Sequence, residues 1–331
     1  MPGFGSNAYV AVCRQNSAGA TAPSSWYNMP FANHGLDWNP EELLDDSISG
    51  NPDTPNRVLG YTRAAGPIVA NVHPIMLGHF LRGLCGQSSP AATSSGTLAY
   101  VHTFNPVSGD FSVVETLPPY AFQVHQGDAS VSSAFLYMDS HINTFELSVA
   151  AGAYVRGTWG IIGKECTLMT KAVPPAWDAG ITPFKWSQAS LQIGGAAVTR
   201  YRDFRFIFDN RIAGQDRINN TTAPAYYFRD GFRSFARFAG TADIAQTDWL
   251  NVKNETALAV DVYLKGATSI VSGINEYLRL QVPRLKLTKH PTGVAGPGIV
   301  TVTIEGMAEY HSGSATVCTF TLCNTFASYN T

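Results

Sequence analysis

The chain has 331 residues, of which 45% are hydrophobic and 14% charged, and its net charge is −2. This balance argues against the basic patch of a nucleic-acid-binding protein and the acidic excess of a disordered tail. No run of about 18 apolar residues predicts a membrane helix.

The first 30 residues are polar and rich in Gly, Ser and Pro. They lack the basic start and apolar core of a signal peptide. We expect residues 1–30 to form an N-terminal arm that becomes ordered only against a neighbouring protein.

The clearest helix candidate is the segment NVHPIMLGHFLRGLCG at 71–86. Pro74 suits the first turn of a helix, and Gly86 is a suitable stop. The apolar spacing between these two residues is helical. The sequence therefore predicts one helix over about 74–84.

Most of the remaining chain has the pattern of strands and turns. In the segment 143–165, apolar Phe145, Leu147 and Val149 alternate with small or polar residues, and a turn at Gly152 leads to a second alternating run. Period-two alternation on both sides of a glycine turn predicts a β-hairpin.

A turn-rich segment at 171–187 contains three prolines and lies close to the middle of the chain. Residues 1–170 have a net charge of −6 and residues 171–331 a net charge of +4. We therefore expect a first β domain at 31–170, a linker at 171–187 and a second β domain at 188–331. Opposite charges on the halves would also let copies associate head to tail.

The two halves contain similar segments in the same order. LLDDSISG at 43–50 resembles IFDNRIAG at 207–214, and each is followed by a long loop and a Gly-rich strand. A strand, a Gly-containing turn and a second strand stand near the end of each half. This order suggests a tandem duplication.

No motif predicts a reactive site, a metal or a cofactor. Gly163 and Lys164 lack the other residues of a phosphate-binding loop. The eight histidines are scattered, and we expect most of them at the surface or in turns. The five cysteines are widely spaced, which favours buried thiols over a disulfide framework. The acidic group of Asp45, Asp46 and Asp53 is typical of a solvated loop, with a hydrolase site as an alternative. We therefore expect a protein that is not an enzyme.

Five stretches in order resemble the tail tube proteins of long-tailed bacteriophages, in particular the large two-repeat type. They cover about residues 40–310, and the most specific are SQASLQIGG and FRFIFDNRI. The resemblance implies a mainly β fold: two tandem domains, each a β-sandwich rolled into a partly open barrel with a short helix on its flank.

The same resemblance implies a structural role in the virion tail, with assembly in the host cytoplasm and no membrane insertion. Copies would form trimeric rings with pseudo-six-fold symmetry, and the rings would stack into a hollow tube. Double-stranded genome DNA, bound without sequence specificity, would pass through the lumen into the host. The implied protein partners are the tape measure protein, the tail terminator and the distal tail protein.

The loops at 45–61 and 211–232 match in position the family's loops that reach the next ring. The expected inter-ring contacts are Asp45, Asp46, Arg57, Arg63, Arg229 and Arg233. An acidic lumen would repel the DNA backbone, and the lumen candidates on predicted strands are Glu115, Asp139 and Glu146. The main alternative to a tube protein is a β-rich ligand-binding or capsid-decoration module.

Overall fold

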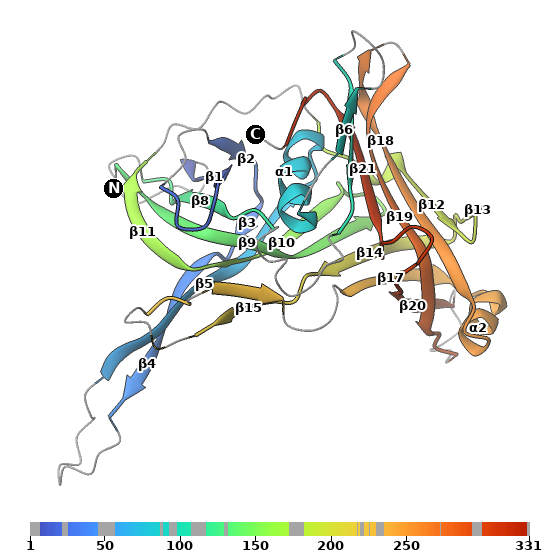
Figure 1. Ribbon diagram of the computed structural model, residues 1–331. Coiled ribbons are helices and arrows are strands. Elements are labelled where there is room, and N and C mark those ends of the chain that lie inside the picture. The colour runs from blue at the N-terminus through green and yellow to red at the C-terminus, as the bar shows by residue number, and fades with distance from the viewer. Residues whose placement is uncertain are drawn as a thin grey trace.

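A long antiparallel sheet forms most of the computed structural model (Figure 1). The structure describes residues 7–21, 26–45, 57–86, 89–92, 98–106, 117–128, 132–171, 182–216, 218, 222–224, 226–229, 235–271, 273–292 and 300–329. The prediction of a mainly β protein with two short helices is confirmed. The sheet is open and does not close into a barrel.

The first part of the chain contains the elements β1 (Tyr9–Arg14), β2 (Tyr27–Met29), β3 (Asn33–His34), β4 (Asp37–Leu44), β5 (Arg57–Asn71), α1 (Pro74–Cys85), β6 (Ser89–Ala92), β7 (Tyr100–Phe104), β8 (Tyr120–His125), β9 (Ser133–Ala150), β10 (Arg156–Gly163) and β11 (Glu165–Thr170). The second part contains a 3₁₀ turn (Trp186–Gln188), β12 (Ala189–Ile193), β13 (Ala196–Ala197), β14 (Tyr201–Asp209), β15 (Ile212–Gln215), β16 (Tyr226–Arg229), β17 (Phe235–Asp243), α2 (Gln246–Lys253), β18 (Ala257–Val271), β19 (Ile274–Lys289), β20 (Thr301–Ala308) and β21 (Thr319–Asn324).

The helix predicted near residue 74 is α1. Pro74 occupies its first turn, and Gly86 ends it in the left-handed region with φ 86°, where its N–H donates to the carbonyl of Arg82 at 3.0 Å. A residue without a Cβ adopts that conformation at little cost. The helix is buried on almost every side, and it packs against β7, β9, β19 and β21.

The predicted hairpin is also confirmed as the pair β9 and β10. Phe145, Leu147 and Val149 are buried, while the residues between them are partly exposed. The ring of Phe145 stacks on Trp159 with centroids 5.7 Å apart. Alternation in the sequence therefore marks which face of this sheet meets the core.

Part of the expected N-terminal arm is instead a strand of the sheet. All six residues of β1 pair with β8, and three also pair with β2. Val10 and Val12 face the main core, whereas Ala11 and Cys13 face a second cluster. Because both faces of β1 are buried, its sequence shows no alternation to predict it.

The order of strand pairing is the same in the two halves. In the first half β1 pairs with β8, β8 with β9, and β9 with β10 and β11, while β10 also pairs with β5 and β5 with β4. In the second half β12 pairs with β18, β18 with β19, and β19 with β20 and β21, while β20 also pairs with β17 and β17 with β14. The strands that correspond to β1, β8, β9, β10, β11, β5 and β4 are therefore β12, β18, β19, β20, β21, β17 and β14.

Two strand pairs join the two halves of the sheet. One is β7 with β21, from Tyr100 opposite Asn324 to Phe104 opposite Phe320. In the other, the second part of β9 pairs with β14, from Asp203 opposite Ala150 to Asp209 opposite Thr144. Buried side chains from both halves also form one continuous hydrophobic cluster. Of the intervening segment expected as a linker, residues 172–181 lie outside the described part of the chain.

Candidate assembly surfaces

The hairpin of β4 and β5 extends away from the body of the protein (Figure 1). Near its end lie four aliphatic side chains, each more than half exposed: Leu43, Leu44, Val58 and Leu59. Exposed aliphatic residues gathered on one projecting element are typical of a surface that another protein covers.

Two of the predicted contact residues lie on this hairpin. Arg57 opens β5 and forms an ion pair with Glu42 on β4, at 3.0 Å between Nη1 and Oε2. Asp45 is exposed and directly follows β4. Asp46 and Asp53 lie outside the described residues, so the acidic group expected in this loop is described only at Asp45.

In the second half, β14 and β17 correspond to β4 and β5, and the segment between them contains the hairpin of β15 and β16, which folds back onto the first half. The amide of Thr62 donates to the carbonyl of Thr222 at 2.7 Å. The hydroxyl of Tyr227 donates to the carbonyl of Gly163 at 2.6 Å. The two hairpins therefore differ, because one projects and the other packs within its own chain.

Arg63 lies beside this packed hairpin, where its guanidinium forms an ion pair with Asp216. Sequence reasoning placed Arg63 against an acidic residue of a neighbouring copy, but nothing in the sequence indicates a partner 153 residues away in the same chain. Arg229 ends β16, and Arg233 lies outside the described residues. A contact of these arginines with another ring stays a prediction.

Glu146 lies on the face of the central sheet that points away from the core. It stands between Thr158 of β10 and Ile207 of β14, and the same row continues to Arg237 of β17. The acidic residues on this face include Glu146, Asp203, Asp209, Asp243 and Glu305, and the basic residues include Arg156, Arg205 and Arg237. The face therefore carries charges of both signs.

Of the other two lumen candidates, only Asp139 is among the described residues, and it does not lie on that face. Asp139 is 8% exposed, and its Oδ1 accepts hydrogen bonds from the Gln15 side chain at 3.1 Å and the Gly19 amide at 2.8 Å. Its backbone is left-handed, with φ 49°, which aspartate tolerates better than most residues. This buried carboxylate holds the N-terminal segment, which argues against a lumen position. Glu115 lies outside the described residues.

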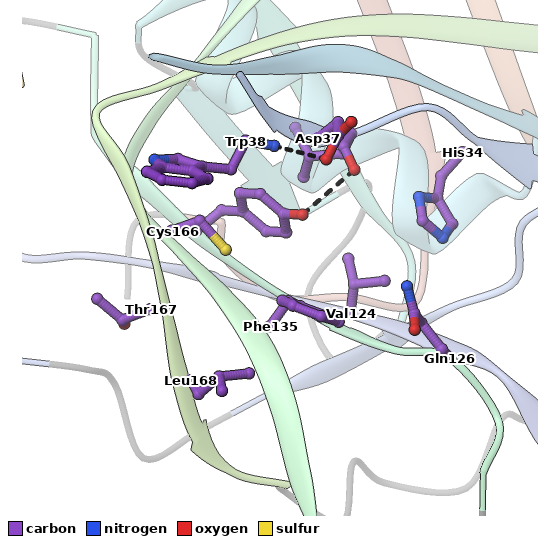
Figure 2. A pocket seen from close by; sticks show the side chains of 11 residues that line it. His34, Asp37, Trp38, Val124, Gln126, Phe135, Cys166, Thr167 and Leu168 are labelled. Carbon is purple, nitrogen blue, oxygen red and sulfur yellow. Dashed lines mark hydrogen bonds between the residues drawn. The ribbon is translucent and has the colours of Figure 1, made fainter. Parts of the chain in front are cut away.

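A cavity of about 280 Å³ opens beside β11 (Figure 2). Its lining comes from β3, β4, β8, β9 and β11, together with the residues adjoining them: His34, Leu36, Asp37, Trp38, Val124, Gln126, Phe135, Tyr137, Cys166, Thr167 and Leu168. The hydroxyl of Tyr137 donates to the carbonyl of Leu36 at 3.2 Å.

The polar groups of this cavity are poorly suited to catalysis. Burial raises the pKa of the Cys166 thiol, so it is protonated at neutral pH and a weak nucleophile. Burial also lowers the pKa of His34 and raises that of Tyr137. The cavity is therefore better suited to receiving an apolar side chain than to chemistry.

Among the residues that the structure describes, no group of three or more His, Cys, Asp or Glu could hold a metal ion. None of the described helices is long and apolar enough to cross a membrane. All five cysteines are free, and four of them are buried, as the spacing predicted.

Comparison with known protein families gives a match over most of the chain. A family model described as phage tail tube protein matches residues 5–308. A search of curated protein sequences finds no match. The family match covers all strands from β1 to β20 and leaves out β21.

Proposed function

Since the chain belongs to the phage tail tube protein family, we propose that its copies assemble into rings that stack into the hollow tube of a bacteriophage tail. The protein is a structural component of that tail. Genome DNA passes through the tube into the host. The tape measure protein occupies the lumen before the DNA, and the tail terminator and distal tail protein bind the two ends of the tube.

The observation that carries this proposal is the strand pair between β9 and β14. There the sheet of one half continues into the sheet of the other half without interruption. In the first half, β3 and β4 occupy the place of β14, and among the described strands they pair only with β5. An open strand edge on a repeated unit favours pairing with another copy.

Ring symmetry follows from treating each half as one wall unit. We take residues 31–170 and 188–331 as the two units, joined by 171–187. If the junction within the chain repeats between chains, three chains supply six units and close a trimeric ring with pseudo-six-fold symmetry.

The exposed face of β9, β10, β14, β17 and β20 is our candidate for the lumen, with Glu146 on it. Acidic and basic side chains are mixed there, as Asp203, Arg205 and Asp209 lie on the same face of β14. A face without a strong excess of positive charge binds DNA phosphates weakly and does not select a sequence, so DNA can slide along it.

The projecting hairpin is our candidate for contact between rings. Its aliphatic end, at Leu43, Leu44, Val58 and Leu59, would be covered by the next ring, and Asp45, Asp46 and Arg57 stand beside it. Arg63 lies further along β5, and on the second half Arg229 and Arg233 belong to or adjoin the loop at 211–232 that holds the equivalent place.

The test is negative-stain electron microscopy and mass measurement of the purified protein over a concentration series. We expect rings or tubes of uniform width with three chains per ring. A variant with Leu44→Ser and Val58→Ser should still form rings but stack poorly. A monomer at every concentration, with or without the tape measure protein, would overturn the proposal and favour a ligand-binding or capsid-decoration module.

A further inference from the structure

The repeated pairing order assigns each residue of one half a counterpart in the other. The β9–β10 register shifts at Asn143 and the β19–β20 register shifts at Thr288, which makes these two residues counterparts. On the same count Tyr137, which pairs with Phe122, corresponds to Val282, which pairs with Val260. The same registers relate β4 to β14 through β5 and β17, since Trp38 lies opposite Ala64 and Phe208 opposite Ala236.

The helices correspond in the same way. Asn71 lies opposite Arg156 at the start of β10, and Asp243 lies opposite Thr301 at the start of β20. Each helix begins three residues later, at Pro74 and at Gln246. Across this segment Val72 corresponds to Ile244, Leu77 to Trp249 and Gly78 to Leu250.

Equivalent positions on the two helices differ sharply in exposure. Val72 is 0% and Leu77 is 1% exposed, whereas Ile244 is 47% and Trp249 is 39% exposed. Leu250 is exposed as well, and α2 buries only Asp248, through an ion pair with Arg200. The outer side of α2 is thus a partly exposed apolar surface, on which the Lys253 ammonium lies 5.1 Å from the centre of the Trp249 ring.

Some strand residues that line the cavity beside β11 are likewise more exposed than their counterparts in the second half. Its residues Leu36, Trp38, Phe135 and Leu168 have as counterparts four residues buried in the main core. These counterparts are Phe206, Phe208, Leu280 and Phe320. Leu36 is buried like its counterpart Phe206, but Trp38 and Leu168 are 38% and 67% exposed, whereas Phe208 and Phe320 are 0% exposed.

Within the chain, α1 of the first half covers β21 of the second half. Asn324 at the end of β21 donates to the carbonyl of Pro74 at 2.9 Å. The ring of Phe320 meets Phe145 edge-on, with centroids 6.0 Å apart. The counterparts of α1 and β21 are α2 and β11, which lie at opposite ends of the molecule (Figure 1) and so cannot cover each other.

We propose that α2 of one copy docks over β11 and the adjoining cavity of the next copy, repeating between chains the contact that α1 makes with β21 within one chain. Ile244, Trp249 and Leu250 are the apolar residues of one side, and Trp38 and Leu168 those of the other. This inference rests on the proposed ring assembly. It adds a second interface between neighbouring copies, separate from the pairing of strands.

The test compares Leu250→Asp and Leu168→Asp with Leu98→Asp, a matched control at a residue that is 69% exposed and outside both surfaces. All three positions are exposed, so the variants should fold, as circular dichroism can verify. Each interface variant should need at least about tenfold more protein for half-assembly into rings, because a buried charge at an interface centre costs well over 1 kcal/mol. The control should assemble like the unmodified protein.

Hydrogen–deuterium exchange gives a second, direct measurement. On ring assembly, the amides of 246–253 and 165–170 should exchange more slowly than in the monomer. If rings form and neither segment gains protection, or both interface variants assemble normally, this inference is overturned while the proposed function stands. If the unmodified protein forms no ring, both are overturned.

Discussion

Replacing Gly78 by alanine tests how the end of the chain holds α1. At an open helical position this change stabilises a helix by about 1 kcal/mol. At Gly78, however, an added Cβ would overlap the Cζ and Cε2 atoms of Tyr329. The Tyr329 ring has little room to move, because its hydroxyl donates to the Ile75 carbonyl at 2.8 Å and accepts from the Asn324 side chain at 2.7 Å.

The overlap decides the sign of the effect. Overpacking a buried site costs about 1–3 kcal/mol, and the fixed ring places this site at the upper end. After the gain in helix propensity is subtracted, we expect Gly78→Ala to lower the free energy of unfolding by about 2 kcal/mol. Urea denaturation followed by tryptophan fluorescence would measure the change.

A double-mutant cycle makes the reasoning specific to this contact. Tyr329→Ala alone should cost about 3–5 kcal/mol, as for other large buried rings. In that background, Gly78→Ala should become neutral or stabilising by up to about 1 kcal/mol. An equal effect of Gly78→Ala in both backgrounds would show that Tyr329 does not limit this position.

Three further predictions concern single side chains. Asn210→Ala should destabilise the protein by about 1–3 kcal/mol in urea, because its buried amide donates to the carbonyl of Leu84 at 2.8 Å and so ties α1 to the second half. Burial raises the pKa of Glu276 from 4.5 to about 7, so the folded state binds this proton more tightly than the unfolded state. The stability of the protein should therefore fall as the pH rises from 4.5 to 7. In thermal melts over this pH range, Glu276→Gln should make the fall in stability smaller. Arg63→Ala should change stability by less than about 1 kcal/mol, since its ion pair with Asp216 is partly exposed, and a larger loss at low salt would contradict this.

Local patterns predicted the elements whose pattern is complete within a short segment. Pro74 and Gly86 bounded α1, and the alternation around Phe145 identified β9 and its buried face. In contrast, α2 was not located, because its eight residues bury only Asp248 and so carry no apolar stripe.

The histidines show where a residue-type expectation was wrong. Five of the eight are buried: His73, His79, His102, His125 and His141. His79, for example, packs against Tyr27 with ring centroids 4.2 Å apart and against Tyr329 at 4.9 Å. Such aromatic surroundings come from segments far apart in the chain, so the local sequence does not predict them.

The sequence by itself determined α1, the β9–β10 hairpin with its buried face and, through the family resemblance, the kind of protein. The tertiary structure decided which elements meet: β9 with β14, Arg63 with Asp216, and Asn324 with α1. These partners lie tens to hundreds of residues apart, and their pairing depends on register and on the packing of the whole sheet. For the same reason only the structure revealed that α2 and β11 lack the cover that α1 and β21 give each other.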